Sequence, residues 1–154
     1  RPVINLGFSG NGKMDAGVGD LIGRVDAGVI VIDCAPNMNA ELLNERTVPL
    51  VKQIRAAHRE VPIVLVEDRR FTNSWITPAK TAYHDANHAA LKTAYASLRR
   101  AGVKHLYFIS GDKLYGTDAE GATDASHASD LGFIRQADIF EPVLKKALRM
   151  GGER

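Results

Sequence analysis

The sequence predicts an α/β protein in which a parallel β-sheet lies between two layers of helices. Short runs rich in Val and Ile recur along the chain, segments with helical spacing separate them, and turn-forming residues follow each run. Strand–helix alternation of this kind produces a parallel sheet with helices on both faces and right-handed crossovers. The length of 154 residues suits a single domain, residues 1–154, without an internal linker.

Four apolar runs predict the strands, because each is nearly continuous, as in strands covered on both faces. These runs are Val3–Phe8, Val29–Cys34, Ile63–Val66 and His105–Ile109. Apolar residues at helical spacing predict the helices between and after them. The helices are Asp15–Val25, Ala40–His58, Ala79–Arg100 and a last helix from about Asp130. We expect Pro49 to break or kink the second helix and Pro142 to restart the fourth.

The composition argues against a nucleic-acid partner, a membrane-spanning segment and an internal disulfide. Hydrophobic residues make up 45% and charged residues 25% of the chain, as in ordinary globular proteins. The net charge is +2 with both signs interspersed, so we expect no nucleic-acid partner. No apolar stretch approaches the ~20 residues that span a membrane. Cys34 is the single cysteine, which excludes an internal disulfide, and its apolar surroundings predict a buried, inert thiol.

Polar residues and glycines follow each predicted strand. Because the carboxyl ends of parallel strands lie at one edge of a sheet, we expect these segments to converge there and form the ligand site. The segments are residues 9–12, 36–39, 67–70 and 110–112. The Gly111–Ser126 loop, rich in Gly, Asp, Thr and Ser, then brings Asp124 and His127 to the same edge.

Asp124 and His127 are the first candidates for chemistry. A carboxylate three residues before an imidazole can accept a hydrogen bond from one ring nitrogen, which leaves the other nitrogen free to take a proton from a nucleophile. The spacing alone favours a solvated turn that caps the next helix. The surrounding pattern therefore decides between an acid–base pair and a capped turn.

Three blocks of sequence occur in register: Asn-Leu-Gly-Phe-Ser-Gly-Asn-Gly, Asp-Cys-Ala-Pro-Asn-Met, and Thr-Asp-Ala-Ser-His-Ala-Ser-Asp-Leu-Gly-Phe. Together they resemble the SGNH hydrolases, or GDSL-type esterases, and most closely the carbohydrate-esterase-like branch. The resemblance extends over essentially the whole chain. It implies a three-layer α/β/α, flavodoxin-like fold and a bacterial serine esterase, secreted or periplasmic, although the chain contains no signal peptide.

The resemblance also implies a role for four residues. Gly10 matches the glycine whose backbone N–H donates to the oxyanion, and Asn37 matches the asparagine whose side-chain amide donates to it. Asp124 and His127 match the acid and the base. Acyl transfer builds negative charge on the carbonyl oxygen, so fixed donors there lower the barrier. The alternatives are a tight turn at Gly10 and, at Asn37, a side chain that bonds its own loop.

One element of the family pattern is not found. The nucleophilic serine of the family lies in a Gly-Asp-Ser-like segment after an earlier strand, ahead of the glycine block. The chain opens on Arg1 inside an apolar run, so we expect an N-terminally shortened copy that lacks its first strand and its nucleophile. Ser9 is a weaker nucleophile candidate, because Gly7-Phe8-Ser9-Gly10-Asn11 only approximates Gly-x-Ser-x-Gly. We expect Ser9 to shape the turn that presents Gly10.

Four further features have alternative interpretations. His84 and His88 are spaced to face one metal ion, but no third ligand accompanies them in sequence, so we expect a solvated helix face. The segment Glu67–Arg70 either binds substrate or forms surface ion pairs. Trp75 and Phe71 either line an acyl or sugar pocket or anchor their loop. The glycines at 7, 10 and 12 match no nucleotide-binding pattern.

The function predicted from these observations is that of a serine ester hydrolase acting on short-chain acyl esters, such as acetyl groups on carbohydrate. We expect a small-molecule or carbohydrate ester as the partner and no metal or organic cofactor. The alternative is a flavodoxin-like binding or scaffold domain that is catalytically incomplete because the serine is absent.

Overall fold

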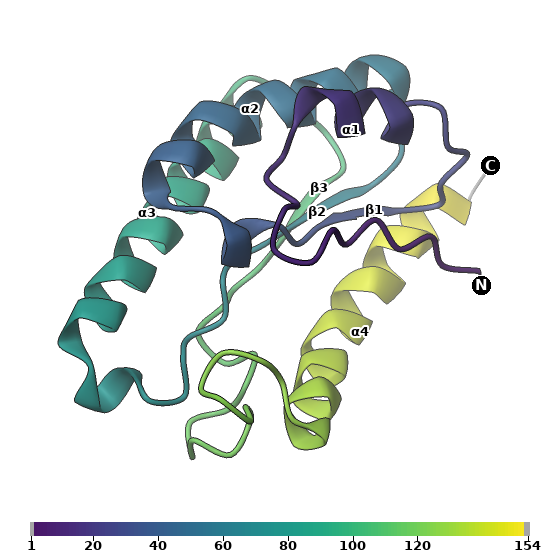
Figure 1. Cartoon of the computed structure of the whole chain (residues 1–154). Helices are drawn as coiled ribbons and strands as arrows, with labels where there is room; N and C mark the ends of the chain where they lie inside the picture. Colours follow the sequence, from purple (N-terminus) through teal and green to yellow (C-terminus); the bar gives the residue numbers. More distant parts are fainter. Residues whose placement is uncertain (1, 153–154) are drawn as a thin grey trace.

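Three parallel strands form the sheet, in the order β1-β2-β3 (Figure 1). The computed structural model describes residues 2–152, and side chains over residues 2–149. The strands are β1 (Ile30–Ile32), β2 (Ile63–Val66) and β3 (Leu106–Ile109). In register, Val64 of β2 lies between Val31 of β1 and Tyr107 of β3. All four residues of β2 are buried, as its continuous apolar run predicts for a central parallel strand.

Helices cover both faces of the sheet (Figure 1). They are α1 (Ala16–Ile22), α2 (Ala40–Ala57), α3 (Pro78–Arg100) and α4 (Asp130–Gly152), with 3₁₀ turns η1 (Ala35–Asn37) and η2 (Ser74–Ile76). The alternation of side chains along β2 divides the core: Ile63 and Leu65 pack with α2 and α3, whereas Val64 and Val66 pack towards α4. The predicted three-layer α/β/α fold class is confirmed.

Both internal prolines lie within continuous helices. α2 begins at a cap in which the Asn39 side chain accepts from the Leu42 N–H at 2.9 Å, and it continues through Pro49. α4 begins after Ser129, whose hydroxyl accepts from the Gly132 N–H at 3.2 Å, and it continues through Pro142. The predicted restart at Pro142, and a break at Pro49, are therefore wrong. A proline removes one backbone hydrogen bond, and packing on both sides of it holds these helices together.

The predicted strand Val3–Phe8 is also wrong, since residues 2–8 form no strand. The Gly7 N–H donates only to the nearby Asn5 side chain, and no ladder hydrogen bond joins the segment to β1. Its apolar side chains lie exposed, with Val3 87% accessible. An apolar run becomes a strand only when a neighbouring strand pairs with it. Within residues 2–152, no helix is long and apolar enough to cross a membrane.

Candidate active site

Asp124 and His127 form a hydrogen-bonded pair at the surface. Asp124 Oδ2 lies 2.7 Å from His127 Nδ1, and Oδ1 accepts from the backbone N–H groups of Ser126 and His127 at 2.9 and 2.7 Å. These backbone and side-chain hydrogen bonds hold the pKa of Asp124 well below its usual range. A carboxylate at Nδ1 fixes the ring proton there and leaves Nε2 as the basic nitrogen. The pair thus has the geometry of an oriented base.

The loop that carries this pair is tightly closed. An antiparallel bridge joins Ala122 to Ala128, and the Thr123 N–H donates to the His127 carbonyl at 2.9 Å. Ala125 has φ 71°, a left-handed conformation that costs energy for any residue with a Cβ. The backbone therefore turns sharply between Asp124 and His127, which lets the two side chains meet.

Three residues, Arg69, Tyr115 and Thr72, anchor the loop to the rest of the protein. Arg69 Nε donates to the Ser126 carbonyl at 2.9 Å, and its guanidinium also contacts the Ser126 hydroxyl. The Tyr115 hydroxyl donates to the same carbonyl at 2.9 Å, and the Thr72 N–H donates to the Ala125 carbonyl at 3.0 Å. The orientation of His127 thus depends on the end of β2 and on the loop after β3.

Arg69 is held in turn by a buried carboxylate. Its Nη1 lies 2.5 Å from Asp68 Oδ1, and the Asp68 side chain is only 1% exposed. Asp33, at the end of β1, lies within the electrostatic reach of the same pair. Although Asp33 borders solvent, desolvation raises its pKa to about 6, an effect that Arg69 opposes and Asp68 reinforces. Charged groups from the ends of β1 and β2 therefore converge behind the Asp124–His127 loop.

Gly10 and Asn37 lie on two adjacent turns. The Asn11 N–H donates to the Phe8 carbonyl at 3.0 Å, closing a turn whose central residues, Ser9 and Gly10, both have positive φ of 46° and 86°. This turn type demands left-handed residues, and glycine adopts that conformation at no steric cost. Among the described residues, the Gly10 N–H has no hydrogen-bond partner.

Asn37 ties these two turns together. It ends η1, and its side-chain Nδ2 donates to the Gly12 carbonyl at 3.3 Å. Cys34, at the start of this turn, is half-buried rather than buried, and desolvation raises the pKa of its thiol. The structure therefore brings Gly10 and Asn37 onto one pair of linked turns and joins Asp124 to His127. No hydrogen bond among the described residues connects the two pairs.

His84 and His88 do not lie on a solvated helix face, and that expectation is wrong. Their exposed fractions are 0% and 3%, because this face of α3 packs over the carboxyl end of β2. The end of β2 is also buried, so Glu67 and Asp68 are not partners in surface ion pairs. Burial lowers the pKa of His84, an effect that the nearby Asp68 carboxylate opposes. The polar residues on this face of α3 do not indicate, from sequence alone, that the face is buried against the sheet.

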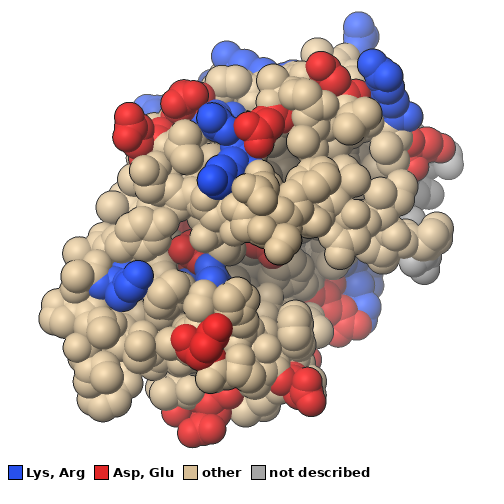
Figure 2. Space-filling view, in the orientation of Figure 1, with Lys and Arg blue, Asp and Glu red and all other residues tan. Residues whose placement is uncertain are grey.

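The two aromatic candidates have different surroundings. Phe71 is half-buried and packs edge-on against His84, with ring centroids 4.7 Å apart. It anchors its loop, one of the two predicted alternatives. Trp75, in η2, is 79% exposed. Two surface hollows of about 500 and 400 Å³ lie on α4 and beside β3, and neither contains Asp124, His127, Gly10 or Asn37. Figure 2 shows both signs of charge interspersed on the face in view, with no continuous basic stripe.

The comparisons with known proteins agree with this architecture. The model of the GDSL-like lipase/acylhydrolase family matches residues 1–145. A crystal structure of a protein described as a GDSL-like lipase, from Bacteroides ovatus, is 34% identical, with a TM-score of 0.90 over 95% of this chain. The salicylyl-acyltransferase SsfX3 from a tetracycline biosynthetic pathway is 16% identical and shares the fold, with a TM-score of 0.72 over 88% of this chain.

The chain spans 43% of the length of the Bacteroides ovatus protein and 42% of the length of the acyltransferase. No functionally curated protein matches it.

Proposed function

Since the chain belongs to the GDSL-like lipase/acylhydrolase family, we propose that it carries the acid, the base and the oxyanion donors of a serine ester hydrolase. The observation that carries this proposal is the contact of 2.7 Å between Asp124 Oδ2 and His127 Nδ1. This contact leaves Nε2 of the exposed His127 ring free, on a loop that backbone hydrogen bonds close. A solvated turn that only caps the next helix would require neither the left-handed conformation of Ala125 nor the contacts from Arg69 to Ser126.

In the proposed reaction, a serine hydroxyl attacks the carbonyl carbon of the ester and His127 Nε2 takes up the hydroxyl proton. The Gly10 N–H and the Asn37 amide donate to the oxygen that becomes negative. The C–O bond then breaks, and the alcohol leaves with the proton from His127. Water attacks the resulting acyl-serine by the same route, which releases the acid and restores the serine. Asp124 stabilises the imidazolium in both steps.

We propose that the nucleophile is the serine of the Gly-Asp-Ser-like segment that precedes the glycine block in the family pattern, outside residues 1–154. Ser9 is the alternative within the chain. Its positive φ and its place in the turn of Gly10 support a structural role in presenting the Gly10 N–H. The substrate class that we propose is short-chain acyl esters, with acetyl groups on carbohydrate as the first to test, on the family resemblance alone.

The test compares hydrolysis of p-nitrophenyl acetate by residues 1–154 with hydrolysis by a longer protein that also carries a Gly-Asp-Ser-like segment ahead of them. His127→Asn and Asp124→Asn should each lower kcat on the order of 10³- to 10⁴-fold. Asn37→Ala should lower it roughly 10²- to 10³-fold. The matched control is His105→Asn, because His105 is also paired with a carboxylate, Glu60, at 3.0 Å, and Asn tolerates its positive φ of 51°.

Equal activity of the His127 and His105 variants would contradict the proposal. Loss of activity in Ser9→Ala, with normal folding, would instead assign the nucleophile to Ser9. If the longer protein hydrolyses neither this ester nor acetylated sugars, the alternative of a catalytically incomplete binding or scaffold domain is favoured.

A further inference from the structure

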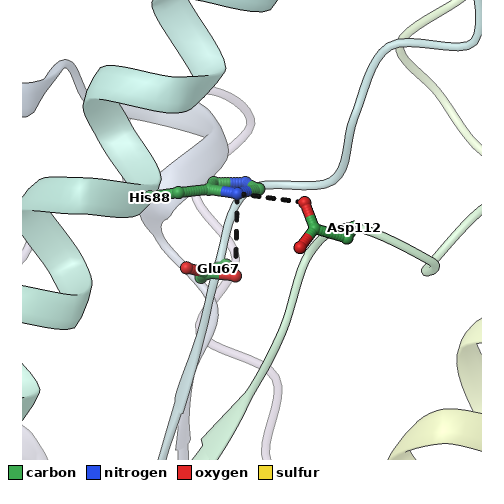
Figure 3. Close-up of side chains that lie close together, drawn as sticks. All are labelled: Glu67, His88 and Asp112. Carbon is green, nitrogen blue, oxygen red and sulfur yellow. Dashed lines mark ion pairs between the residues drawn. The ribbon is translucent and has the colours of Figure 1, made fainter.

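We propose that Glu67, His88 and Asp112 form a site for one divalent cation of the zinc or manganese type. Figure 3 shows the three side chains converging from the end of β2, from α3 and from the loop after β3. One ligand atom from each lies within 4.8 Å of the other two. The expectation of no metal rested on the lack of a third ligand in sequence beside His88. The fold supplies two carboxylates from distant segments.

The imidazole of His88 is oriented as in a metal ligand. Its Nε2 lies 2.6 Å from the Asp68 carbonyl, which can only accept, so the ring proton resides on Nε2. The other nitrogen, Nδ1, is left with its lone pair. It is buried without a hydrogen-bond partner, and the residue is 3% exposed. Histidines that bind metals are commonly held by a carbonyl at the opposite ring nitrogen in this way.

The distances favour a shared ion over a shared proton. His88 Nδ1 lies 3.7 Å from Glu67 Oε2 and 3.4 Å from Asp112 Oδ1. A proton on Nδ1 would make hydrogen bonds of about 2.7–2.9 Å with a carboxylate. Two ligands held about 2.0–2.2 Å from one ion at a tetrahedral angle lie about 3.3–3.6 Å apart. The observed spacing is close to the second range.

Glu67 is a fixed ligand. Its side chain is fully buried, and Oε2 accepts from the Ser110 hydroxyl and the Gly111 N–H at 3.0 and 2.9 Å. The other oxygen, Oε1, lies 3.3 Å from Lys92 Nζ. Ligating carboxylates are typically held by such hydrogen bonds. The Ser110 hydroxyl also lies 3.2 Å from Asp112 Oδ2, so its single proton can be donated to either carboxylate.

Arg70 is the cation that competes for this position. Its Nε lies 3.1 Å from Asp112 Oδ1, while its Nη1 lies 2.6 Å from Asp85. Arg70 therefore keeps one carboxylate partner when Asp112 turns to an ion. The Asp112 side chain is half exposed, which gives an ion a path inward.

The donor set indicates the kind of ion. One imidazole nitrogen with two carboxylate oxygens suits zinc and manganese, whereas calcium prefers six to eight oxygen ligands. The site joins β2, α3 and the loop after β3, so a bound ion would link three segments that are far apart in sequence.

The experiment is isothermal titration of the metal-stripped chain with ZnCl₂ at pH 7.5, with CaCl₂ as the comparison. We expect one zinc bound per chain, at least tenfold weaker binding in Asp112→Asn, and no binding in His88→Gln. The matched control is Asp85→Asn, because Asp85 is the other carboxylate partner of Arg70 and is similarly exposed, yet lies outside the cluster. This control should bind zinc as the wild type does.

Absence of stoichiometric zinc binding would overturn the proposal, as would Asp112→Asn binding with wild-type affinity. Loss of binding in His127→Asn, with Asp112→Asn unaffected, would move the ion to the exposed pair and also overturn it. Asp112 lies at the surface, so its variant should keep the wild-type circular dichroism spectrum even if His88→Gln does not fold. Zinc binding requires no ester hydrolysis, so this result is independent of the proposed activity.

Discussion

Arg69 offers a direct test of how far the buried carboxylate of Asp68 depends on its guanidinium partner. Replacing it by Leu removes the charge while keeping an apolar stem. The Asp68 carboxylate, 1% exposed, then loses its guanidinium partner. Breaking a buried ion pair by removing one partner typically costs roughly 3–5 kcal/mol, because the remaining charge is left without compensation. The Ser126 carbonyl keeps its hydrogen bond from Tyr115, so we expect little further loss there.

The loss should depend on pH because His84 Nε2 lies 3.6 Å from Asp68 Oδ2. In the wild type, burial lowers the pKa of His84, and the charge of Arg69 contributes to this lowering. The unfolded state, with a pKa near 6.5, therefore binds more protons, and the wild type loses stability as the pH falls below that value. Without Arg69, the pKa of His84 in the folded state rises towards the unfolded value. His84 can then be protonated and compensate Asp68, so the difference between variant and wild type shrinks at low pH.

The measurement is urea unfolding followed by circular dichroism at pH 8 and pH 5. We expect Arg69→Leu to lower the free energy of unfolding by about 3–5 kcal/mol at pH 8 and by clearly less at pH 5. The double variant Asp68→Asn with Arg69→Leu, which leaves no buried charge, should recover at least half of the loss. A loss under about 1 kcal/mol, or one that is equal at both pH values, would refute the reasoning.

Three further stability changes follow from local geometry and are measured by the same unfolding assay. Gly111→Ala should destabilise by about 1–3 kcal/mol or more, because an added Cβ would lie 1.9 Å from the Asp68 carbonyl oxygen; an unchanged midpoint would contradict this close approach. Gly17→Ala, within α1 and with no atom within 4 Å of the new Cβ, should instead stabilise by about 0.5–1 kcal/mol. Ser129→Ala should lower the free energy of unfolding by about 1 kcal/mol, because the cap of α4 is lost. Ser129→Thr keeps a hydroxyl at the cap and should keep most of the wild-type stability.

The fold could be predicted from sequence wherever the pattern reflects burial. The run Ile63–Val66 is the central strand with the predicted bounds, since only a strand covered on both faces is apolar at every position. Val3–Phe8 has the same pattern and forms no strand, because pairing depends on a neighbour that no local pattern encodes. Pro49 breaks no helix, because tertiary packing outweighs the loss of one backbone hydrogen bond.

The site could be predicted only where its contacts are local. Asp124 and His127 are three residues apart, so their sequence spacing already limits how they can meet. Arg69, by contrast, contacts Ser126 across 57 positions of sequence, and its neighbours along the chain say nothing of that partner. The helical spacing of His84 and His88 correctly placed both on one face of α3. Whether that face is buried depends on how α3 packs against the end of β2.

Asp68 shows why these nonlocal contacts matter for function. Its backbone carbonyl accepts from His88, and its carboxylate holds Arg69, which in turn holds Ser126 next to His127. The two groups of one residue therefore face the proposed cation site and the proposed catalytic loop. We expect a shift of the Asp68 backbone to disturb both the imidazole of His88 and the guanidinium of Arg69, because the two contacts are 2.6 and 2.5 Å long. The end of β2 is thus the element on which the geometry of both proposed sites depends.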